Sequence, residues 1–423
     1  MARQYLLERT TAPVREAVAH LCGLQAQEPQ EPFTGLWSRL HAFTPGLLDR
    51  ALTDRQVVRT HLMRRTVHLV TGDDALAWRG RHDTMLRQRV LATYRSELAG
   101  IDLDEVAAAG RAVMADGRPR TMAELVDALQ DRWPGPPRRA LGELLVAALV
   151  PMAQLPPRGL WQTRSGVRNL PLATWLGHDG TAPPDGTRGA GEADGAGAAS
   201  ATSGAGGASG AGGASGAGGA SGAGGASGAG GASGTGGASG TGGADPAGER
   251  AGEEADDPVG QGLVRRYLAA YGPAATADIR AWSGVAGLPA AVRALRDELV
   301  TFRDERGRLL LDLPDAPRPS PDTPAPVRFL PAFDNAILGY HDRSRIIDDA
   351  HLGLSVAGLR AVLVDGRVAA TWTPRERQLL VTPLRPLSAQ EGEAVREEGH
   401  RLADFLDRGI DRVRLTAPGA VPG

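Results

Sequence analysis

The sequence contains no lysine, and all 47 of its basic residues are arginine. A chain without lysine has no side-chain primary amine. It therefore offers neither the Walker A lysine of a nucleotide-binding loop nor a lysine that forms a Schiff base with a substrate or with pyridoxal phosphate. Enzyme classes that depend on lysine chemistry are excluded.

Cysteine is nearly absent as well, since Cys22 is the only one. Disulfides, iron–sulfur clusters and cysteine zinc sites all need more than one thiol, and the nine histidines do not show the HExxH spacing of metalloproteases. We therefore expect no metal centre and no cofactor, in a protein that works in a reducing cytoplasm.

Long apolar runs are also missing. Residues 1–5 do not open the apolar stretch of a signal peptide, and no window is as long as a membrane span. We expect a soluble protein that is not exported and makes no contact with membranes. The net charge of -2 and the pI of about 6.5 argue against coating nucleic acid by bulk charge, but they leave room for a local basic face.

What the sequence has in abundance is glycine. Seven tandem hexapeptides, five SGAGGA and two SGTGGA, fill residues 203–244. Such a segment buries too little apolar surface to offset the entropy of ordering, so we expect residues 185–257 to form a disordered Gly/Ala/Ser insert. Two interpretations stay open: a tether that lets the flanking halves close around a large ligand, and slippage of the repeat in a tolerant loop.

Residues 258–313 show the pattern of a winged helix, which is three helices followed by a hairpin. Gly272-Pro273 and Gly284 separate the expected helices, and Gly307 marks the expected turn. The expected helices span 259–271, 276–283 and 288–299, and the expected strands span 299–302 and 309–313.

Two further segments fit the same order of elements. In residues 103–176 we expect helices at 104–115 and 138–150, Thr121 as a helix N-cap, and a strand pair within 161–172 that turns at Ser165-Gly166. Near the N-terminus we expect helices at 13–22, 33–42 and 45–53 and strands at 57–62 and 66–70.

After residue 326 the pattern favours strands. The dipeptide Asp365-Gly366 is typical of a type I′ hairpin turn. The expected strands span 327–330, 361–364, 368–372 and 378–382, and a final helix spans 388–408.

A pair of glutamines, Gln25 and Gln27, directly follows the first expected helix. Residues two apart point to nearly opposite faces of a helix but to the same side of an extended segment, so the two amides converge only if the helix has ended. Gly23 is the natural place for it to end. By itself a QxQ tripeptide is common by chance, and a buried glutamine that satisfies backbone groups is the ordinary alternative.

Arginine is concentrated between residues 55 and 98. This window holds nine arginines and four acids, a balance of +5. Arg64 and Arg65 fall at the expected hairpin tip, where arginine suits contact with phosphate or the minor groove. For any single arginine of the run, Arg59 included, a merely solvated face explains the charge equally well.

Five segments, in order, resemble the AlkZ-type bacterial winged-helix DNA glycosylases. They are GLQAQ at 23–27, the hairpin at 57–70, YLAAYGPAATADIRAW at 267–282, LPAFDNAILGYHDRSRII at 330–347 and VLVDGRVAATW at 362–372. The resemblance covers the chain apart from the insert, which is not a family feature. A second departure is Arg65, because the family commonly has glycine there.

The resemblance implies an α+β fold, with tandem winged-helix motifs and a C-terminal β-rich, barrel-like part that form a concave DNA-binding surface. The implied divisions are 1–100 for winged helix 1 with the QxQ motif and the Arg-rich hairpin, 101–184 for winged helix 2, 185–257 for the insert, 258–320 for winged helix 3, and 321–423 for the β-rich part with the final helix.

The resemblance also implies an activity: excision of N-alkylated purines from double-stranded DNA, and in some members unhooking of interstrand crosslinks, in DNA repair or in self-resistance to a genotoxin. Its catalytic motif matches Gln25 and Gln27. An N7-alkylated purine already carries positive charge and leaves readily, so two neutral amides that place a water suffice. Because a crosslinked purine cannot rotate into a deep pocket, an open groove is expected. We expect the enzyme to act as a monomer associated with the nucleoid.

Other polar residues are candidates for DNA contact. His68 follows the hairpin tip, although a histidine on a half-buried strand is often structural. Asp334 and Asn335 either line the cleft or simply form a turn. Without lysine, only the chain N-terminus offers an amine for nicking an abasic site, so we expect a monofunctional glycosylase. The alternatives are a non-catalytic winged-helix transcription regulator and a scaffold that binds another protein.

Overall fold

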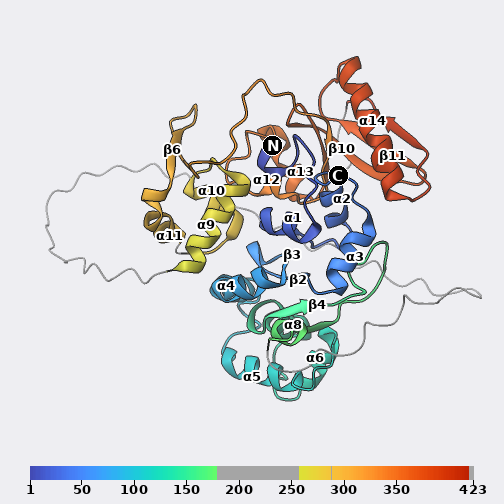
Figure 1. Ribbon diagram of the computed structural model, residues 1–423. Helices are drawn as coiled ribbons and strands as arrows, with labels where there is room; N and C mark the ends of the chain where they lie inside the picture. The colour runs from blue at the N-terminus through green and yellow to red at the C-terminus, as the bar shows by residue number, and fades with distance from the viewer. Residues whose placement is uncertain (179–256, 287, 419–423) are drawn as a thin grey trace, which may run out of the picture. The chain divides into compact units, whose positions relative to one another are not determined.

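The computed structural model describes residues 1–178, 257–286 and 288–418, which form a mixed α+β protein (Figure 1). The predicted insert at 185–257 lies outside the described residues, apart from Asp257. Among the described helices, none combines the length and the apolar character that a membrane span requires. The predicted fold class is therefore confirmed at the level of α+β.

The N-terminal half is built on a five-stranded sheet with the order β1-β3-β2-β4-β5. All its strand pairs are antiparallel. The strands are β1 (Leu24–Gln25), β2 (Val57–His61), β3 (Val67–Thr71), β4 (Met152–Gln154) and β5 (Asn169–Pro171). The helices before the hairpin are η1 (Ala2–Gln4), α1 (Val14–His20), α2 (Glu31–Trp37) and α3 (Pro45–Thr53), and a short turn of helix, η2 (Met63–Arg65), forms the tip between β2 and β3.

A long helix, α4 (Gly72–Thr93), follows the hairpin directly. Thr71 caps it by accepting a hydrogen bond from the Asp74 amide at 3.1 Å, and Asp73 and Asp74 suit the positive end of its dipole. The sequence shows no continuous apolar stripe that would predict this helix, because Arg79 and His82 occupy buried positions on it.

Residues 103–176 form α5 (Leu103–Val113), α6 (Met122–Leu129), α7 (Arg138–Glu143) and α8 (Leu172–Leu176), with a π-helical segment, η3 (Leu144–Leu149), after α7. Thr121 is the N-cap of α6, as predicted, in a reciprocal capping box with Glu124. The predicted strand pair within 161–172 is wrong: β5 pairs with β4, and residues 161–168 contain no strand. Ser165-Gly166 therefore lies in a loop, and the hairpin expected there is replaced by strands that join the N-terminal sheet.

Residues 258–312 follow the prediction closely. The elements are α9 (Pro258–Tyr271), α10 (Thr276–Ser283), α11 (Leu288–Ala294), η4 (Arg296–Glu298), β6 (Val300–Arg303) and β7 (Leu309–Asp312). Gly284 ends α10 with a φ of 72°, a left-handed conformation that glycine adopts without strain.

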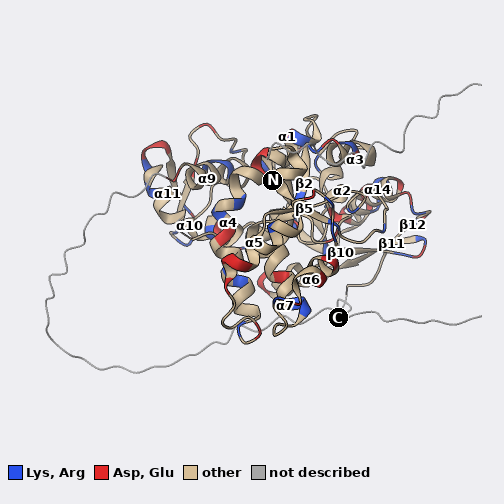
Figure 2. Ribbon diagram, turned by 90° about the horizontal axis from the view of Figure 1, so that it is seen from below, with Lys and Arg blue, Asp and Glu red and all other residues tan. Residues whose placement is uncertain are grey.

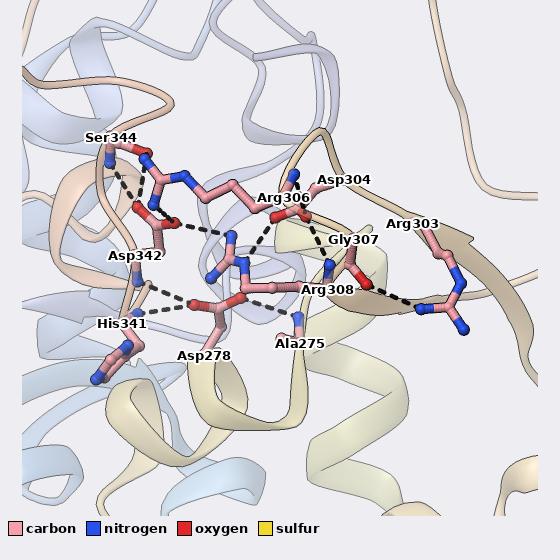
Figure 3. A network of polar contacts seen from close by, with 10 residues as sticks. All are labelled: Ala275, Asp278, Arg303, Asp304, Arg306, Gly307, Arg308, His341, Asp342 and Ser344. Carbon is pink, nitrogen blue, oxygen red and sulfur yellow. Dashed lines mark hydrogen bonds and ion pairs between the residues drawn. The ribbon is translucent and has the colours of Figure 1, made fainter.

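The β6–β7 hairpin is tied to the loop after residue 340 by a polar network (Figure 3). Asp278, on α10, accepts hydrogen bonds from the amides of Ala275, His341 and Asp342 at 2.9, 2.9 and 3.2 Å. Arg308 bridges the carboxylates of Asp304 and Asp342 at 2.6 and 2.9 Å. These contacts fix the hairpin against the neighbouring loop.

The C-terminal part is a second five-stranded sheet with the order β12-β11-β10-β9-β8. The strands are β8 (Arg328–Phe329), β9 (Arg360–Val364), β10 (Arg367–Arg375), β11 (Gln378–Pro383) and β12 (Arg412–Leu415). A bulge between Val368 and Ala370 interrupts the register of β9 and β10, which lets the sheet curl. The turn residues Asp365 and Gly366 have φ values of 48° and 73°, as a type I′ turn requires.

The helices of this part are α12 (Asn335–Leu338), η5 (Asp349–His351), α13 (Leu352–Val356) and α14 (Ala389–Leu406). Hydrophobic clusters cross the predicted domain boundaries. One joins Val58 and Val70 of the hairpin to Tyr267 and Trp282 of α9 and α10, and another joins α1 to the C-terminal sheet. The side chains around the glutamine pair are thus held by cores that several segments share.

Candidate functional site

The glutamine pair lies where helix α1 gives way to strand β1. Gly23 makes the turn, with a φ of 85° and an amide that donates to the Val18 carbonyl at 2.9 Å. A side chain could not be accommodated there, because a Cβ on Gly23 would lie 2.6 Å from the Val70 side chain and 2.9 Å from the Leu69 carbonyl oxygen. Helix α1 itself ends at His20, earlier than predicted, and the chain turns through Cys22 and Gly23, which both have a positive φ. The helix has therefore ended before the glutamines, as expected.

Strand β1 runs antiparallel to β3, with Gln25 opposite His68. The extended pairing continues to Ala26, whose amide donates to the Val67 carbonyl at 2.8 Å. Ala26 is buried, whereas Gln25 is half-buried and Gln27 is exposed. The alternation places both glutamine side chains on the side of the segment opposite to Ala26.

Both amide oxygens are held by the β2–β3 hairpin. Oε1 of Gln25 accepts a hydrogen bond from Nη2 of Arg64 at 2.8 Å, and Oε1 of Gln27 accepts one from the backbone amide of Val67 at 3.2 Å. Each oxygen has two lone pairs, so each can accept a hydrogen bond from a further donor such as a water.

Arg64 extends from the hairpin tip into the interior. Besides Gln25, its Nη2 donates to Oδ1 of Asn335 at 3.0 Å, and its Nη1 donates to the Trp282 carbonyl at 2.8 Å. Burial lowers the pKa of Arg64 to about 10, so the guanidinium stays charged at neutral pH. Its backbone has a φ of 57°, in the left-handed region.

Asp334 and Asn335, at the start of α12, are both buried. The Asp334 carboxylate caps α12 through the Ala336 amide at 2.7 Å and pairs with Arg39 at 2.8 and 2.9 Å. Asn335 faces the glutamine instead: its Oδ1 accepts from Arg64, and its Nδ2 donates to the Gly23 carbonyl at 3.4 Å. The structure thus brings Asn335 together with Gln25 and uses Asp334 to hold the turn.

A small cavity of about 10 Å³ lies beside Gln25, and it has room for about one water. Gln25, Asp334 and Asn335 line it, together with Gln4 and Glu31. Gln4 is buried, and its Oε1 has no hydrogen-bond partner in the part of the chain that the structure describes. Polar groups therefore surround a water-sized space at the first glutamine.

His68 is fully buried on β3. Its Nδ1 lies 3.1 Å from the Thr66 carbonyl, and a carbonyl oxygen only accepts, so Nδ1 carries the proton. Burial holds the pKa of His68 well below its usual range, with a further contribution from Arg64. A neutral, buried imidazole has no access to the DNA backbone in this conformation, which supports the structural alternative for His68.

The arginines of the 55–98 window do not form one continuous basic surface. Arg59 and Arg79 are each only 2 % exposed, and Arg59 donates to Oε1 of Gln154 at 3.2 Å. Arg81 pairs with Asp257 at 2.9 Å. In Figure 2 basic and acidic residues alternate on α4. The burial of Arg59 counts against a direct DNA contact.

Arg65 differs from its neighbour Arg64. Its Nη1 donates to Oγ1 of Thr93 at 3.0 Å and to the Arg89 carbonyl at 3.3 Å, on the surface of the hairpin tip. Its φ of 65° lies in the left-handed region, which glycine adopts most easily. Arg65 is the predicted DNA contact that remains accessible.

Three residues that support the site could not be recognised from the sequence: Arg39, Glu31 and Gln4. Glu31 is 3 % exposed, and it pairs with Arg360 and accepts from the Ala332 amide at 2.6 Å. Arg39 and Asp334 are separated by 295 residues. No local sequence pattern indicates that Arg39 and Asp334 pair. A buried ion pair between residues so far apart can be recognised only when the fold is known.

Within residues 1–178, 257–286 and 288–418, no three His, Cys, Asp or Glu side chains gather in a group that could hold a metal ion. The polar groups that line the water-sized space include the amides of Gln4, Gln25 and Asn335, the carboxylates of Glu31 and Asp334, and the guanidinium of Arg39.

The sequence matches the family model described as DNA glycosylase AlkZ-like over residues 18–214 and 227–405. The chain belongs to this AlkZ-like DNA glycosylase family, as the resemblance of its five segments predicts. Among solved structures, the Streptomyces sahachiroi DNA glycosylase AlkZ matches with a TM-score of 0.66 over 98% of this chain and 97% of that chain, at 20% identity. At this identity the likeness is one of fold. No curated protein matches the chain.

Proposed function

We propose that this protein is a DNA glycosylase that hydrolyses the N-glycosidic bond of N7-alkylated purines, with Gln25 and Gln27 as catalytic residues. The observation that carries the proposal is the fixed direction of their two amide oxygens, which the Arg64 side chain and the Val67 amide hold on one side of an extended segment. Membership of the AlkZ-like family supplies the reaction class.

The chemistry suits neutral side chains. Alkylation at N7 gives the purine a positive charge, so it leaves as a neutral base and needs no general acid. The water oxygen bonds to C1′ of the deoxyribose as the C1′–N9 bond breaks, the bonding electrons pass to the purine, and the surplus proton of the water passes to solvent. The two amide oxygens orient the water and direct their negative ends at the oxocarbenium-like centre.

The substrate is double-stranded DNA. We propose that residues 1–100 and 258–320 act as winged-helix motifs on it, that Arg65 contacts the phosphate backbone, and that the protein works as a monomer at the nucleoid. The half-buried position of Gln25 and the exposed position of Gln27 favour a shallow site over a deep pocket. A shallow site suits bulky N7 adducts and the unhooking of N7-linked interstrand crosslinks, which cannot be flipped freely.

The proposal is tested by base release from three matched duplexes: one with a single N7-methylguanine, one with an N7-linked interstrand crosslink, and one unmodified. We expect release from the first two and none from the third. Release of unmodified purines at a comparable rate would contradict the proposed reliance on a cationic leaving group. No release from either modified duplex would refute the function.

We also propose that the enzyme does not nick the abasic product. A lyase step needs an amine, and without lysine only the α-amino group of Met1 offers one. Burial and nearby arginines lower the pKa of that amine to about 6, but Met1 packs against the hydrophobic cluster that includes Leu6 and Ile346, and it does not line the Gln25 cavity. Borohydride treatment with abasic DNA should trap no adduct, and efficient trapping would contradict the proposal.

A further inference from the structure

We infer that Arg64 is a positioning residue for Gln25, one that orients the catalytic amide from inside the protein instead of reading DNA. The inference rests on the proposed function, because it concerns the geometry of the same site. It also changes the role that the sequence suggests for Arg64, which is a DNA contact at a hairpin tip.

The contacts of Arg64 join three elements far apart in the chain. Its guanidinium binds Gln25 on β1, Asn335 at the start of α12, and the Trp282 carbonyl near the end of α10. The hairpin tip lies beside the end of α10, since a Cβ built on Gly284 would be in ordinary van der Waals contact with the Arg64 backbone nitrogen, at 3.5 Å. The guanidinium therefore reaches its partners from a backbone that lies next to α10.

A guanidinium has only donors, and this decides how the two amides are turned. Gln25 and Asn335 must each present oxygen to Arg64, because a flipped amide would place its NH₂ group against another donor. The terminal torsion of glutamine is otherwise broad and nearly two-fold. Asn335 is fixed further through its Nδ2, which donates to the Gly23 carbonyl at 3.4 Å.

Charge alone gives Arg64 no catalytic advantage. Its three acceptors are neutral oxygens, and a cation beside a centre that develops positive charge raises the barrier by repulsion. Its contribution is therefore geometric: it directs the second lone pair of Gln25 Oε1 toward the water. A DNA phosphate near the lesion is the anion that would offset its charge in the complex.

Arg65 provides a matched comparison in the same hairpin. It is the next residue, carries the same charge and also has a positive φ, but its side chain donates hydrogen bonds to Thr93 and to the Arg89 carbonyl and not to Gln25. A difference between Arg64→Ala and Arg65→Ala therefore separates positioning of the amide from the loss of a positive charge near DNA.

The experiment is single-turnover release of N7-methylguanine from a duplex at saturating enzyme, with DNA affinity and its salt dependence measured separately. We expect Arg64→Ala to slow release by roughly 10- to 100-fold, as misplacement of a catalytic group does. Arg64→Lys should slow release by as much, since a lysine keeps the positive charge but lacks the planar guanidinium with its several N–H donors. Arg65→Ala should weaken DNA binding and slow release at least tenfold less than Arg64→Ala.

Two further readouts separate positioning from a structural role. Added guanidinium ion should restore part of the rate of Arg64→Ala but none of the rate of Arg64→Ala/Gln25→Ala. That double variant should be no slower than Gln25→Ala alone, because both changes remove one coupled unit. If Arg64→Ala does not fold, as judged by circular dichroism, the Arg64→Lys rate decides the question.

Release at the wild-type rate by Arg64→Ala or Arg64→Lys at saturating enzyme would overturn the inference and leave the proposed function intact. Additive losses in the double variant would overturn it as well. A wild-type enzyme that releases no base overturns the proposed function, and this inference falls with it.

Discussion

Three histidines lie close to the site, one on each of β2, β3 and α4: His61, His68 and His82. Burial lowers the pKa of His61 and of His82 to about 4 and holds the pKa of His68 well below its ordinary 6.5. His82 donates from Nδ1 to the Trp78 carbonyl at 2.8 Å, and its Nε2 has no partner among the described residues. All three are neutral in the folded protein.

This neutrality makes stability depend on pH. Between pH 4 and 6.5 the unfolded chain binds protons at these histidines that the folded protein does not bind. Their contribution to the free energy of unfolding is therefore fully present above pH 6.5 and is lost as the pH falls toward 4. Each such histidine contributes a slope of about 1.4 kcal/mol per pH unit. Thermal melts at intervals from pH 7.5 to 4.5 should show this decline.

His82→Gln should flatten the decline, because it removes one site of proton uptake in the unfolded chain. His400→Gln, on the exposed face of α14, is the matched control and should leave the slope close to that of the wild type. An unchanged slope in His82→Gln would show that the decline has another source.

At the scale of elements, the two-residue strand β1 depends on the turn at Gly23. An alanine there would be held at a φ of 85°, and its Cβ would meet the Val70 side chain and the Leu69 carbonyl. We expect Gly23→Ala to cost about 1–3 kcal/mol of stability and to displace Gln25, so that base release slows even where the protein remains folded.

Gly100→Ala separates the two causes. Gly100 also has a positive φ, 77°, but an added Cβ would meet nothing within 4 Å. We expect a smaller loss of melting temperature than in Gly23→Ala, and base release at the wild-type rate. Equal losses in the two variants would mean that the close approach to β3 is unimportant.

The elements that could be predicted are those with local signals. The helices of 258–294 end at Gly272-Pro273 and Gly284, the helix at 122–129 starts from the Thr121 cap, and Asp365-Gly366 makes its turn, because in each case a few neighbouring residues decide the conformation. The prediction of a strand pair within 161–172 is wrong because strand pairing there is not local: β5 pairs with β4, and β4 pairs with β2. A turn preference at Ser165-Gly166 carries no information about those distant partners.

At the scale of the whole molecule, the site draws on segments that only the fold brings together. The sequence locates Gln25 and Gln27 in an extended segment that follows a helix, because the end of a helix and an extended segment are local properties. It does not reveal that Arg64 donates a hydrogen bond to Asn335, which is 271 residues away, or that Arg39 pairs with the Asp334 carboxylate. Such contacts depend on the hydrophobic clusters that join the hairpin to α9 and α10.

The central claim is that the two glutamine amides carry the chemistry. Its most direct measurement compares single-turnover release of N7-methylguanine with DNA affinity in Gln25→Ala, Gln27→Ala and the wild type. We predict that each variant loses at least tenfold in rate and binds the duplex nearly as tightly as the wild type, since removing a group that acts mainly in the transition state lowers the rate rather than the binding. Wild-type release rates in both variants would contradict the claim, and sequence-specific binding without base release would favour a transcription regulator.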